Sequence, residues 1–411
     1  MSDNPAFVIV GGGLAGAKAV EALRGNDFDG QIILFSAEEH LPYERPPLSK
    51  DFLGGTKKLD EFTVDTAAWY RDHDVDLRLG ASVEAVDPAS HAVTLPDGST
   101  AGYDKLLLAT GSRSRHIALP GADAAGVHYL RTIDDAAALD DALSAGASLA
   151  IVGAGWIGLE VAASARQRGV AVTVVETAPL PLLAALGSEA AQVFADLHRE
   201  HDVDLRLQTE VAAVATENGA ARGLILGDGT VVAADAVLIA VGAQPNIELA
   251  QRAGLAIGDG GVVVDAGLRT SDPDIYAVGD IAAAYHPLLH TRIRIEHWAN
   301  ALKQPAVAAA GMLGIATEYS ELPYFFTDQY DLGMEYVGYA PDYARVVFRG
   351  DPASREFIAF WLDTADRVLA GMNVNVWDVT DDVKALIGAR QPVDVAALGD
   401  PSTPLSALVS T

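Results

Sequence analysis

The sequence predicts an α/β protein built on parallel sheets, with a separate α+β domain of antiparallel strands near its C-terminal end. Two stretches share one order of elements, an apolar strand, a glycine turn, a helix and a second strand: "AFVIVGGG" to "QIILFS", and "SLAIVGAG" to "VAVTVVE". A repeated strand–helix–strand unit is typical of parallel sheets. From about Tyr330 the pattern changes to short strands separated by Pro, Gly and Asp, which indicates antiparallel pairing.

The first glycine turn has the spacing of a dinucleotide-binding loop. Gly11, Gly13 and Gly16 follow a strand and open the helix "LAGAKAVEALRG", which closes at Gly25. Glycines at these places let the backbone approach a pyrophosphate, and the helix N-terminus stabilises the negative charge. The alternative, for one copy taken alone, is a turn that only joins a strand to a helix.

The second glycine turn repeats this spacing at Gly153, Gly155 and Gly158 and adds an acid. Glu176 ends the following strand, 23 residues after Gly153, where a carboxylate can accept hydrogen bonds from an adenosine ribose. The aligned position in the first copy is Ser36. We therefore expect two Rossmann-like domains with different ligands, and NADH rather than NADPH at the second.

Three further apolar strands each end in a glycine turn. They are "YDKLLLATGS" with Ala109, Thr110 and Gly111, "ADAVLIAVGAQPN" with Gly242, and "TSDPDIYAVGD" with Gly279 and Asp280. Asp280 would present a carboxylate at a sheet edge. The alternative is an ordinary aspartate in a turn.

Composition excludes several classes of protein. A chain of 411 residues that is 50% hydrophobic is long enough for two or three domains. It has no cysteine, which excludes disulfides, thiolate nucleophiles and protein-held iron–sulfur clusters and fits a reducing cytoplasm. The net charge of −28 argues against a nucleic-acid partner.

Neither a membrane segment nor a metal site is predicted. The N-terminal "MSDNPAFVIV" lacks the basic and apolar regions of a secretory signal, and the charge-free stretch 142–159 indicates a loop, a strand and a turn. His286 and His290 lie four residues apart, but Pro287 argues against a helix and no acidic motif accompanies them.

An ordered set of motifs covers nearly the whole chain: "VGGGLAG", "LPYERPPLSK", "LLLATGS", "GAGWIGLE", "TSDPDIYAVGD" and "IEHWANA". In these motifs the chain resembles FAD-dependent NADH:ferredoxin reductases of the putidaredoxin reductase type, and more distantly apoptosis-inducing factor and rubredoxin reductases. The resemblance implies a glutathione-reductase-like fold with an NAD domain inserted into a split FAD domain. The implied ranges are 1–118 and 248–325 for the FAD domain, 119–247 for the NAD domain and 326–411 for a C-terminal interface domain.

The resemblance also implies which residues contact the cofactors. Ala15 and its glycines would contact the FAD phosphates, Val83 the adenine end, Asp280 the ribityl chain, and Lys50 and Trp298 the flavin. The full set of implied cofactor-binding residues is Gly11, Gly13, Leu14, Ala15, Gly16, Arg45, Lys50, Val83, Ala109, Thr110, Gly111, Arg131, Gly279, Asp280, Glu296, His297, Trp298, Gly153, Gly155, Trp156, Ile157, Gly158, Glu160, Glu176 and Gly242.

Lys50 and Glu160 form the candidate catalytic pair. Pro46 and Pro47 stiffen the loop before Lys50, which suits a side chain that must be placed accurately. Glu160 lies two residues after Gly158, in the first turns of the nucleotide helix, where an acid close to phosphates is unfavourable without a function. The alternative is two solvated surface charges.

The implied activity is transfer of a hydride from NADH to FAD, followed by single electrons to a [2Fe–2S] ferredoxin that serves a haem or Rieske oxygenase. The expected protein is a monomer or weak homodimer without membrane contact. Rubredoxin as acceptor stays open, as does a redox-sensing NADH-binding protein similar to apoptosis-inducing factor. Relatives often have "WFW" where this chain has "YFF" at Tyr324–Phe326, so an electron route through a tryptophan cannot be transferred. Arg292 and Arg294 alternate on one face of "HTRIRIEH", either as a docking contact for the acceptor or as a solvated strand face.

Overall fold

The computed structural model describes residues 5–409, and its contacts divide the chain into two compact units. The first unit comprises Met1–Glu44, Leu59–Arg113 and Ala243–Pro323, and the second comprises Arg45–Lys58, Ser114–Gly242 and Tyr324–Thr411. Two short strands, β8 (Ser112–Ser114) and β17 (Ala243–Pro245), lie where the chain passes between the units. The four domain ranges given above stay predictions.

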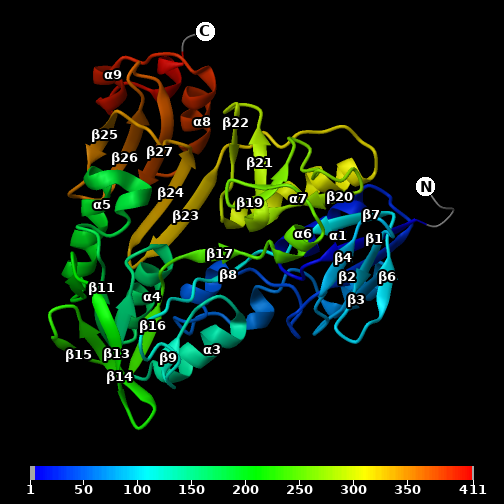
Figure 1. Ribbon diagram of the computed structural model, residues 1–411. Coiled ribbons are helices and arrows are strands. Elements are labelled where there is room, and N and C mark those ends of the chain that lie inside the picture. Colours follow the sequence, from blue (N-terminus) through cyan, green and yellow to red (C-terminus); the bar gives the residue numbers. More distant parts are fainter. Residues whose placement is uncertain (1–4, 410–411) are drawn as a thin grey trace. The chain divides into compact units, whose positions relative to one another are not determined.

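The first unit is organised around a five-stranded parallel sheet, as the sequence predicts (Figure 1). Its strand order is β20-β7-β1-β2-β3, and β1 pairs in parallel with both β2 and β7. Helix α1 (Leu14–Gly25) follows β1 and packs against α7 (Trp298–Met312). The strands are β1 (Ala6–Val10), β2 (Gln31–Phe35), β3 (Val75–Arg78), β7 (Lys105–Leu108) and β20 (Ile275–Ala277).

Smaller elements complete the first unit. One three-stranded antiparallel sheet has the order β4-β5-β6, and one mixed sheet has the order β18-β19-β21-β22. The strands are β4 (Ala85–Asp87), β5 (Ala92–Thr94), β6 (Thr100–Gly102), β18 (Ile257–Gly258), β19 (Gly261–Val264), β21 (Ala282–His286) and β22 (Thr291–Ile293). The short helices are α2 (Ala67–Asp72), α6 (Glu248–Arg252), η2 (Leu59–Glu61) and η3 (Gly279–Ile281).

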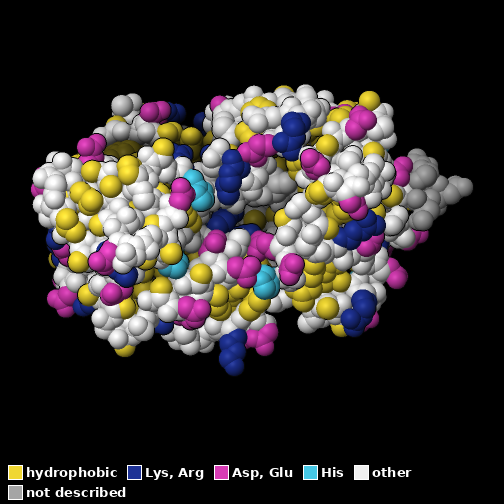
Figure 2. Space-filling view, turned by 60° about the horizontal axis from the view of Figure 1, so that its bottom comes forward, with side chains coloured by type: hydrophobic (Ala, Val, Ile, Leu, Met, Phe, Trp, Pro, Cys, Tyr) yellow, Lys and Arg dark blue, Asp and Glu magenta, His cyan; other side chains and the backbone are white. Residues whose placement is uncertain are grey.

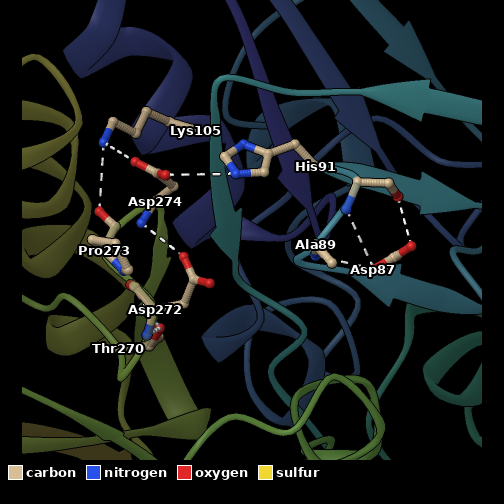
Figure 3. A network of polar contacts seen from close by, with 9 residues as sticks. Asp87, Ala89, His91, Lys105, Thr270, Asp272, Pro273 and Asp274 are labelled. Atoms are coloured by element: carbon tan, nitrogen blue, oxygen red, sulfur yellow. Dashed lines mark hydrogen bonds and ion pairs between the residues drawn. The ribbon is translucent and has the colours of Figure 1, made fainter.

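A polar network fixes the turn that leads into β20 (Figure 3). The backbone N–H of Asp272 donates to the Thr270 hydroxyl at 3.1 Å, and that of Asp274 donates to the Asp272 carboxylate at 2.9 Å. Asp274 also forms an ion pair with Lys105 at the start of β7, and its carboxylate lies 3.7 Å from Nε2 of His91. These contacts hold the entry of β20, and Gly279 and Asp280 follow just beyond its other end, in η3.

The second unit repeats the parallel architecture (Figure 1). Its main sheet has the order β12-β11-β10-β16-β9, all in parallel, beside a three-stranded antiparallel sheet, β13-β14-β15. The helices are α3 (Ile133–Ala142), α4 (Trp156–Gln167) and α5 (Leu183–Glu200), and η1 (Pro46–Ser49) lies in the segment from 45 to 58. The strands are β9 (Val127–His128), β10 (Ser148–Val152), β11 (Ala171–Val175), β12 (Asp204–Arg206), β13 (Val211–Glu217), β14 (Ala220–Leu226), β15 (Val231–Ala233) and β16 (Ala236–Ile239).

The C-terminal sheet is antiparallel, as predicted, and it begins one strand before Tyr330, where the sequence pattern changes. Its order is β23-β24-β27-β26-β25, with α8 (Thr380–Ala389), α9 (Val395–Gly399) and η4 (Leu405–Leu408) following. The strands are β23 (Tyr324–Gln329), β24 (Leu332–Gly338), β25 (Arg345–Asp351), β26 (Glu356–Leu362) and β27 (Val368–Val374). The strand before Tyr330, β23, contacts α4.

Between residues 5 and 409, we find no helix that is both long and apolar enough to cross a bilayer. The charge-free stretch 142–159 contains the end of α3, the whole of β10 and the beginning of α4.

Candidate active site

The first glycine loop tolerates no side chain at its turn. Gly11 has φ of +125°, and a Cβ there would lie 2.1 Å from the carbonyl oxygen of Ala109. A Cβ on Gly16 would lie 2.0 Å from the carbonyl oxygen of Gly11. Gly13, the N-cap of α1, has open space around its Cα instead. The open space at Gly13 therefore lies at the N-terminus of α1, where a phosphate is favoured.

The second loop has the same geometry and a carboxylate beside it. Gly153 has φ of +102°, and the Glu176 carboxylate follows β11. One oxygen of Glu176 accepts from the N–H of Ala154 at 2.8 Å, within the loop itself, and the other accepts from the N–H of Ala178 at 2.8 Å. The carboxylate is thus fixed at the loop, where the sequence places the ribose of NADH.

The third turn presents Asp280 at the end of β20. Its carboxylate is buried, 8% exposed, and accepts from the Ser112 hydroxyl at 2.7 Å. The N–H of Gly279 donates to the side-chain oxygen of Gln304 on α7 at 2.8 Å, and Arg294 donates to the Asp280 carbonyl at 3.2 Å. Sequence reasoning missed Gln304, which has no motif around it.

Three predicted residues meet where α7 begins. Trp298 is the first residue of the helix, and the ring Nδ1 of His297 accepts from the N–H of Ala299 at 3.2 Å as its N-cap. Glu296 forms an ion pair with Arg294. The helix therefore begins at Trp298 as expected, with its positive dipole end among these side chains.

Lys50 and Glu160 are not solvated surface charges, because they form a buried ion pair. The Lys50 Nζ lies 2.7 Å from Oε1 of Glu160, and their side chains are 14% and 5% exposed. The Ser49 hydroxyl donates to the other oxygen, Oε2, at 2.5 Å. Thr327 of β23 donates to Oε1 at 2.6 Å and was not predicted. Three donors on one carboxyl group describe an ionised carboxylate, which can only accept.

Other predicted contact residues are held by the fold around them. Arg45 donates to the carbonyl oxygen of Arg131, and Val83 packs half-buried against the hydrophobic core of the first unit. The Thr110 hydroxyl donates to the carbonyl of Asn246 at 2.7 Å, and the N–H of Asn246 donates to the carbonyl of Gly111 at 2.8 Å. Their roles toward cofactors stay predictions.

The two candidate docking arginines have internal contacts. Arg292 donates to the carbonyl oxygens of Val264 and Ala283 at 2.6 and 3.0 Å. Its side chain is 29% exposed and that of Arg294 is 21% exposed. Both guanidiniums therefore brace neighbouring backbone, and only part of each faces solvent.

Two features bear on metals and polyanions. His286 is buried and contacts the carbonyl of Glu321 through Nε2 at 2.9 Å, and along residues 5–409 no group of three or more His, Asp or Glu side chains is arranged for a metal ion. On the face drawn in Figure 2, acidic side chains are spread over the surface, and lysines and arginines are isolated among them.

This fold and these two loops define a class of proteins. Residues 5–305 match the family model of pyridine nucleotide-disulphide oxidoreductases, and residues 324–409 match the reductase C-terminal family. The chain belongs to the pyridine nucleotide-disulphide oxidoreductase family and lacks the cysteines of a redox disulfide.

The particular relatives carry the names of reductases. The chain is 42% identical to the ferredoxin–NAD(+) reductase component of the anthranilate 1,2-dioxygenase system of Burkholderia cepacia, over 98% of this chain and 99% of that one. It is 37% identical to putidaredoxin reductase of Pseudomonas putida, over 100% and 98%. The crystal structure of a covalent putidaredoxin reductase–putidaredoxin complex matches with a TM-score of 0.95 and 36% identity, over 99% of this chain and 98% of that one. The predicted resemblance to the putidaredoxin reductase type is confirmed.

Proposed function

We propose that this protein is an FAD-dependent NADH:ferredoxin reductase that serves an oxygenase. The observation that carries the proposal is the pair of glycine loops, one of them with an acid for the ribose, combined with full-length similarity to reductase components of oxygenase systems. Each molecule of NADH would reduce two ferredoxins by one electron each and release NAD⁺ and a proton.

The first unit has the donor set for FAD. Gly11, Gly13 and Gly16 would hold the pyrophosphate at the N-terminus of α1, and the buried carboxylate of Asp280 would accept from the ribityl hydroxyls. FAD, when bound, accepts an electron pair in one step and returns electrons singly. Trp298 begins α7, whose N-terminus stabilises negative charge on a bound ring.

The second unit has the donor set for NADH. Gly153, Gly155 and Gly158 would hold its pyrophosphate, and Glu176 would accept from the hydroxyls of its adenosine ribose. We assign Lys50 to contact with the flavin and Glu160 to the orientation of Lys50, through their 2.7 Å ion pair.

The electron acceptor follows from the chemistry that the chain lacks. Without cysteine it cannot carry a disulfide relay, which supports an exit of electrons one at a time. We propose a small [2Fe–2S] ferredoxin as the acceptor, a monomeric or weakly dimeric reductase, and the cytoplasm as its compartment.

The test is NADH-dependent cytochrome c reduction with a panel of ferredoxins and rubredoxins. We expect a yellow protein with about one FAD per chain and turnover with a [2Fe–2S] ferredoxin. Turnover with rubredoxin alone would identify the acceptor as rubredoxin. Tight NADH binding without turnover on any acceptor would contradict the proposal and favour a redox sensor.

A further inference from the structure

The Glu160 carboxylate is held by three side chains from two separate parts of the sequence, residues 49–50 and residue 327, all within the second unit. Ser49 binds one oxygen, and Lys50 and Thr327 share the other, at 2.5, 2.7 and 2.6 Å. Thr327 is fully buried at 0% exposed. We propose that Thr327 of the C-terminal domain is a positioning residue that fixes Glu160 and, through it, Lys50 for hydride transfer; this inference rests on the function proposed above.

The register between β23 and α4 explains why this threonine reaches the site. Residues i and i+4 of a helix are about 6 Å apart along its axis, and residues i and i+2 of a strand are about 6.6 Å apart. Phe325 of β23 meets Trp156 of α4 with ring centroids 5.0 Å apart, and one step further Thr327 meets Glu160. A strand and a helix with matched spacing thus bring Thr327 to the carboxylate.

A buried chain of hydrogen bonds sets the direction of the Thr327 hydroxyl. The side-chain nitrogen of Gln329 donates to Oγ1 of Thr327 at 3.2 Å, and the Gln329 oxygen lies 2.8 Å from Nε2 of His198. Burial lowers the pKa of His198 to about 4, so the ring is neutral and donates from Nε2. Since Gln329 donates to Thr327, the threonine proton is left for Glu160.

Removal of this hydroxyl would release one side of the carboxylate. Glu160 would keep Ser49 and Lys50 but could rotate about its terminal bond, and the ammonium of Lys50 would lose its fixed partner. A loosely held Lys50 slows a step that depends on placement and leaves coenzyme binding nearly unchanged. The alternative is that Thr327 only fills the core between β23 and α4.

Paired substitutions separate these two roles. Thr327→Val keeps the shape and loses the hydroxyl, whereas Thr327→Ser keeps the hydroxyl. In stopped flow with NADH, we expect Thr327→Val to reduce bound flavin about tenfold more slowly, with an unchanged dissociation constant for NADH, and Thr327→Ser to stay near wild type. Thr380→Val is the matched control, because Thr380 also donates to a carboxylate, the half-buried one of Glu335 at 3.1 Å, outside this network.

A second readout does not depend on turnover. The holoenzyme is acylated with a lysine reagent and mapped by mass spectrometry, with Lys57 and Lys303, 45% and 42% exposed, as internal references. Thr327→Val should make Lys50 react several-fold faster, even if the protein reduces no ferredoxin. Failure of the proposed function therefore leaves this result intact.

A double-mutant cycle with Glu160→Gln completes the test. If Thr327 acts through Glu160, adding Thr327→Val to the Glu160→Gln variant should slow flavin reduction only slightly further. Equal losses in both backgrounds, a Thr327→Ser variant as slow as Thr327→Val, or wild-type reduction and labelling in Thr327→Val would each overturn the proposal.

Discussion

The two strand–turn–helix–strand motifs of this chain, one in each unit, have nearly the same backbone structure. In each, the N–H of the first glycine donates to the last residue of the second strand at 2.9 Å, Gly11 to Phe35 and Gly153 to Val175. In each, the two strands pair over five residues in parallel. Both motifs therefore share the backbone structure of the loop. The two motifs differ in the side chains that surround it.

Two aligned positions carry those differences. Glu176 reaches the second loop, whereas Ser36 is buried and donates to the carbonyl of Glu38. Two residues after the third glycine, α4 has the buried Glu160 and α1 has Lys18, which pairs with Glu21 on the helix surface. The same backbone thus forms two different sites, because the two aligned positions carry side chains of different charge in each motif.

The largest expected effect comes from the glycines that both units share. Gly11→Ala and Gly153→Ala each place a residue with a Cβ at positive φ, and that Cβ meets a backbone carbonyl oxygen. The strain should cost about 3 kcal/mol, which would lower the affinity of the loop for its nucleotide roughly hundredfold. Gly11→Ala should be purified with little FAD. Gly153→Ala should keep FAD and raise the Michaelis constant for NADH.

Flavin absorbance and steady-state kinetics measure both outcomes. Gly25→Ala is the control, since its Cβ meets nothing within 4 Å. Loss of FAD from Gly153→Ala with retention by Gly11→Ala would reverse the assignment of ligands to loops.

The next effect concerns the position occupied by Glu160 and Lys18. Lys50→Ala and Glu160→Gln should each slow flavin reduction roughly tenfold to hundredfold, the equivalent of a hydrogen bond to a charged group. FAD content should stay near wild type. Lys18→Ala, the matched change on α1, should leave reduction unchanged. Wild-type rates in both site variants would show that the buried pair serves only stability.

A smaller effect is expected at the acid that distinguishes the loops. Glu176→Ser gives the second unit the residue of the first, and it should narrow the preference for NADH over NADPH by about tenfold. The wild-type enzyme should prefer NADH by at least that factor. Specificity constants for the two coenzymes measure this, with the exposed Glu217→Ser as control. Equal use of both coenzymes by the wild type would refute the assignment.

The smallest effect is expected for the arginines of the first unit. Charge reversal of Arg292 and Arg294 should lower ferredoxin association at low salt by about threefold or less, because both guanidiniums bind backbone carbonyls. It should also lower the melting temperature. Lys384→Glu, a change of a half-buried lysine in the second unit, is the comparison. An association rate that falls steeply with an unchanged melting temperature would instead identify these arginines as a docking surface.

Features that depend on a local sequence pattern could be predicted from the sequence. Glycine spacing and the acid after β11 predicted both loops, and the motifs predicted Lys50 and Glu160. The sequence could not predict hydrogen-bond partners that come together only when the chain folds. Gln304 and Thr327 are single polar residues outside every motif, Ser49 lies in "LPYERPPLSK" but had no contact assigned to it, and β23 begins before Tyr330, where the sequence pattern changes. Only the structure shows that β23 contributes to the carboxylate of α4.

The neutral His198 at the end of the buried chain gives the second unit a sensitivity to acid. Its pKa in the folded protein is about 4, below the 6.5 of an unfolded chain, mainly because burial disfavours the charged ring. As pH falls from 6.5 toward 4, the unfolded chain binds a proton that the folded protein does not, so the stability present above pH 6.5 is lost over that window. The free energy of unfolding falls by about 3 kcal/mol over this window, which is a large part of the free energy of unfolding of an ordinary domain. Mild acid should therefore unfold the surroundings of His198 early, and His198→Gln should flatten the dependence of unfolding free energy on pH.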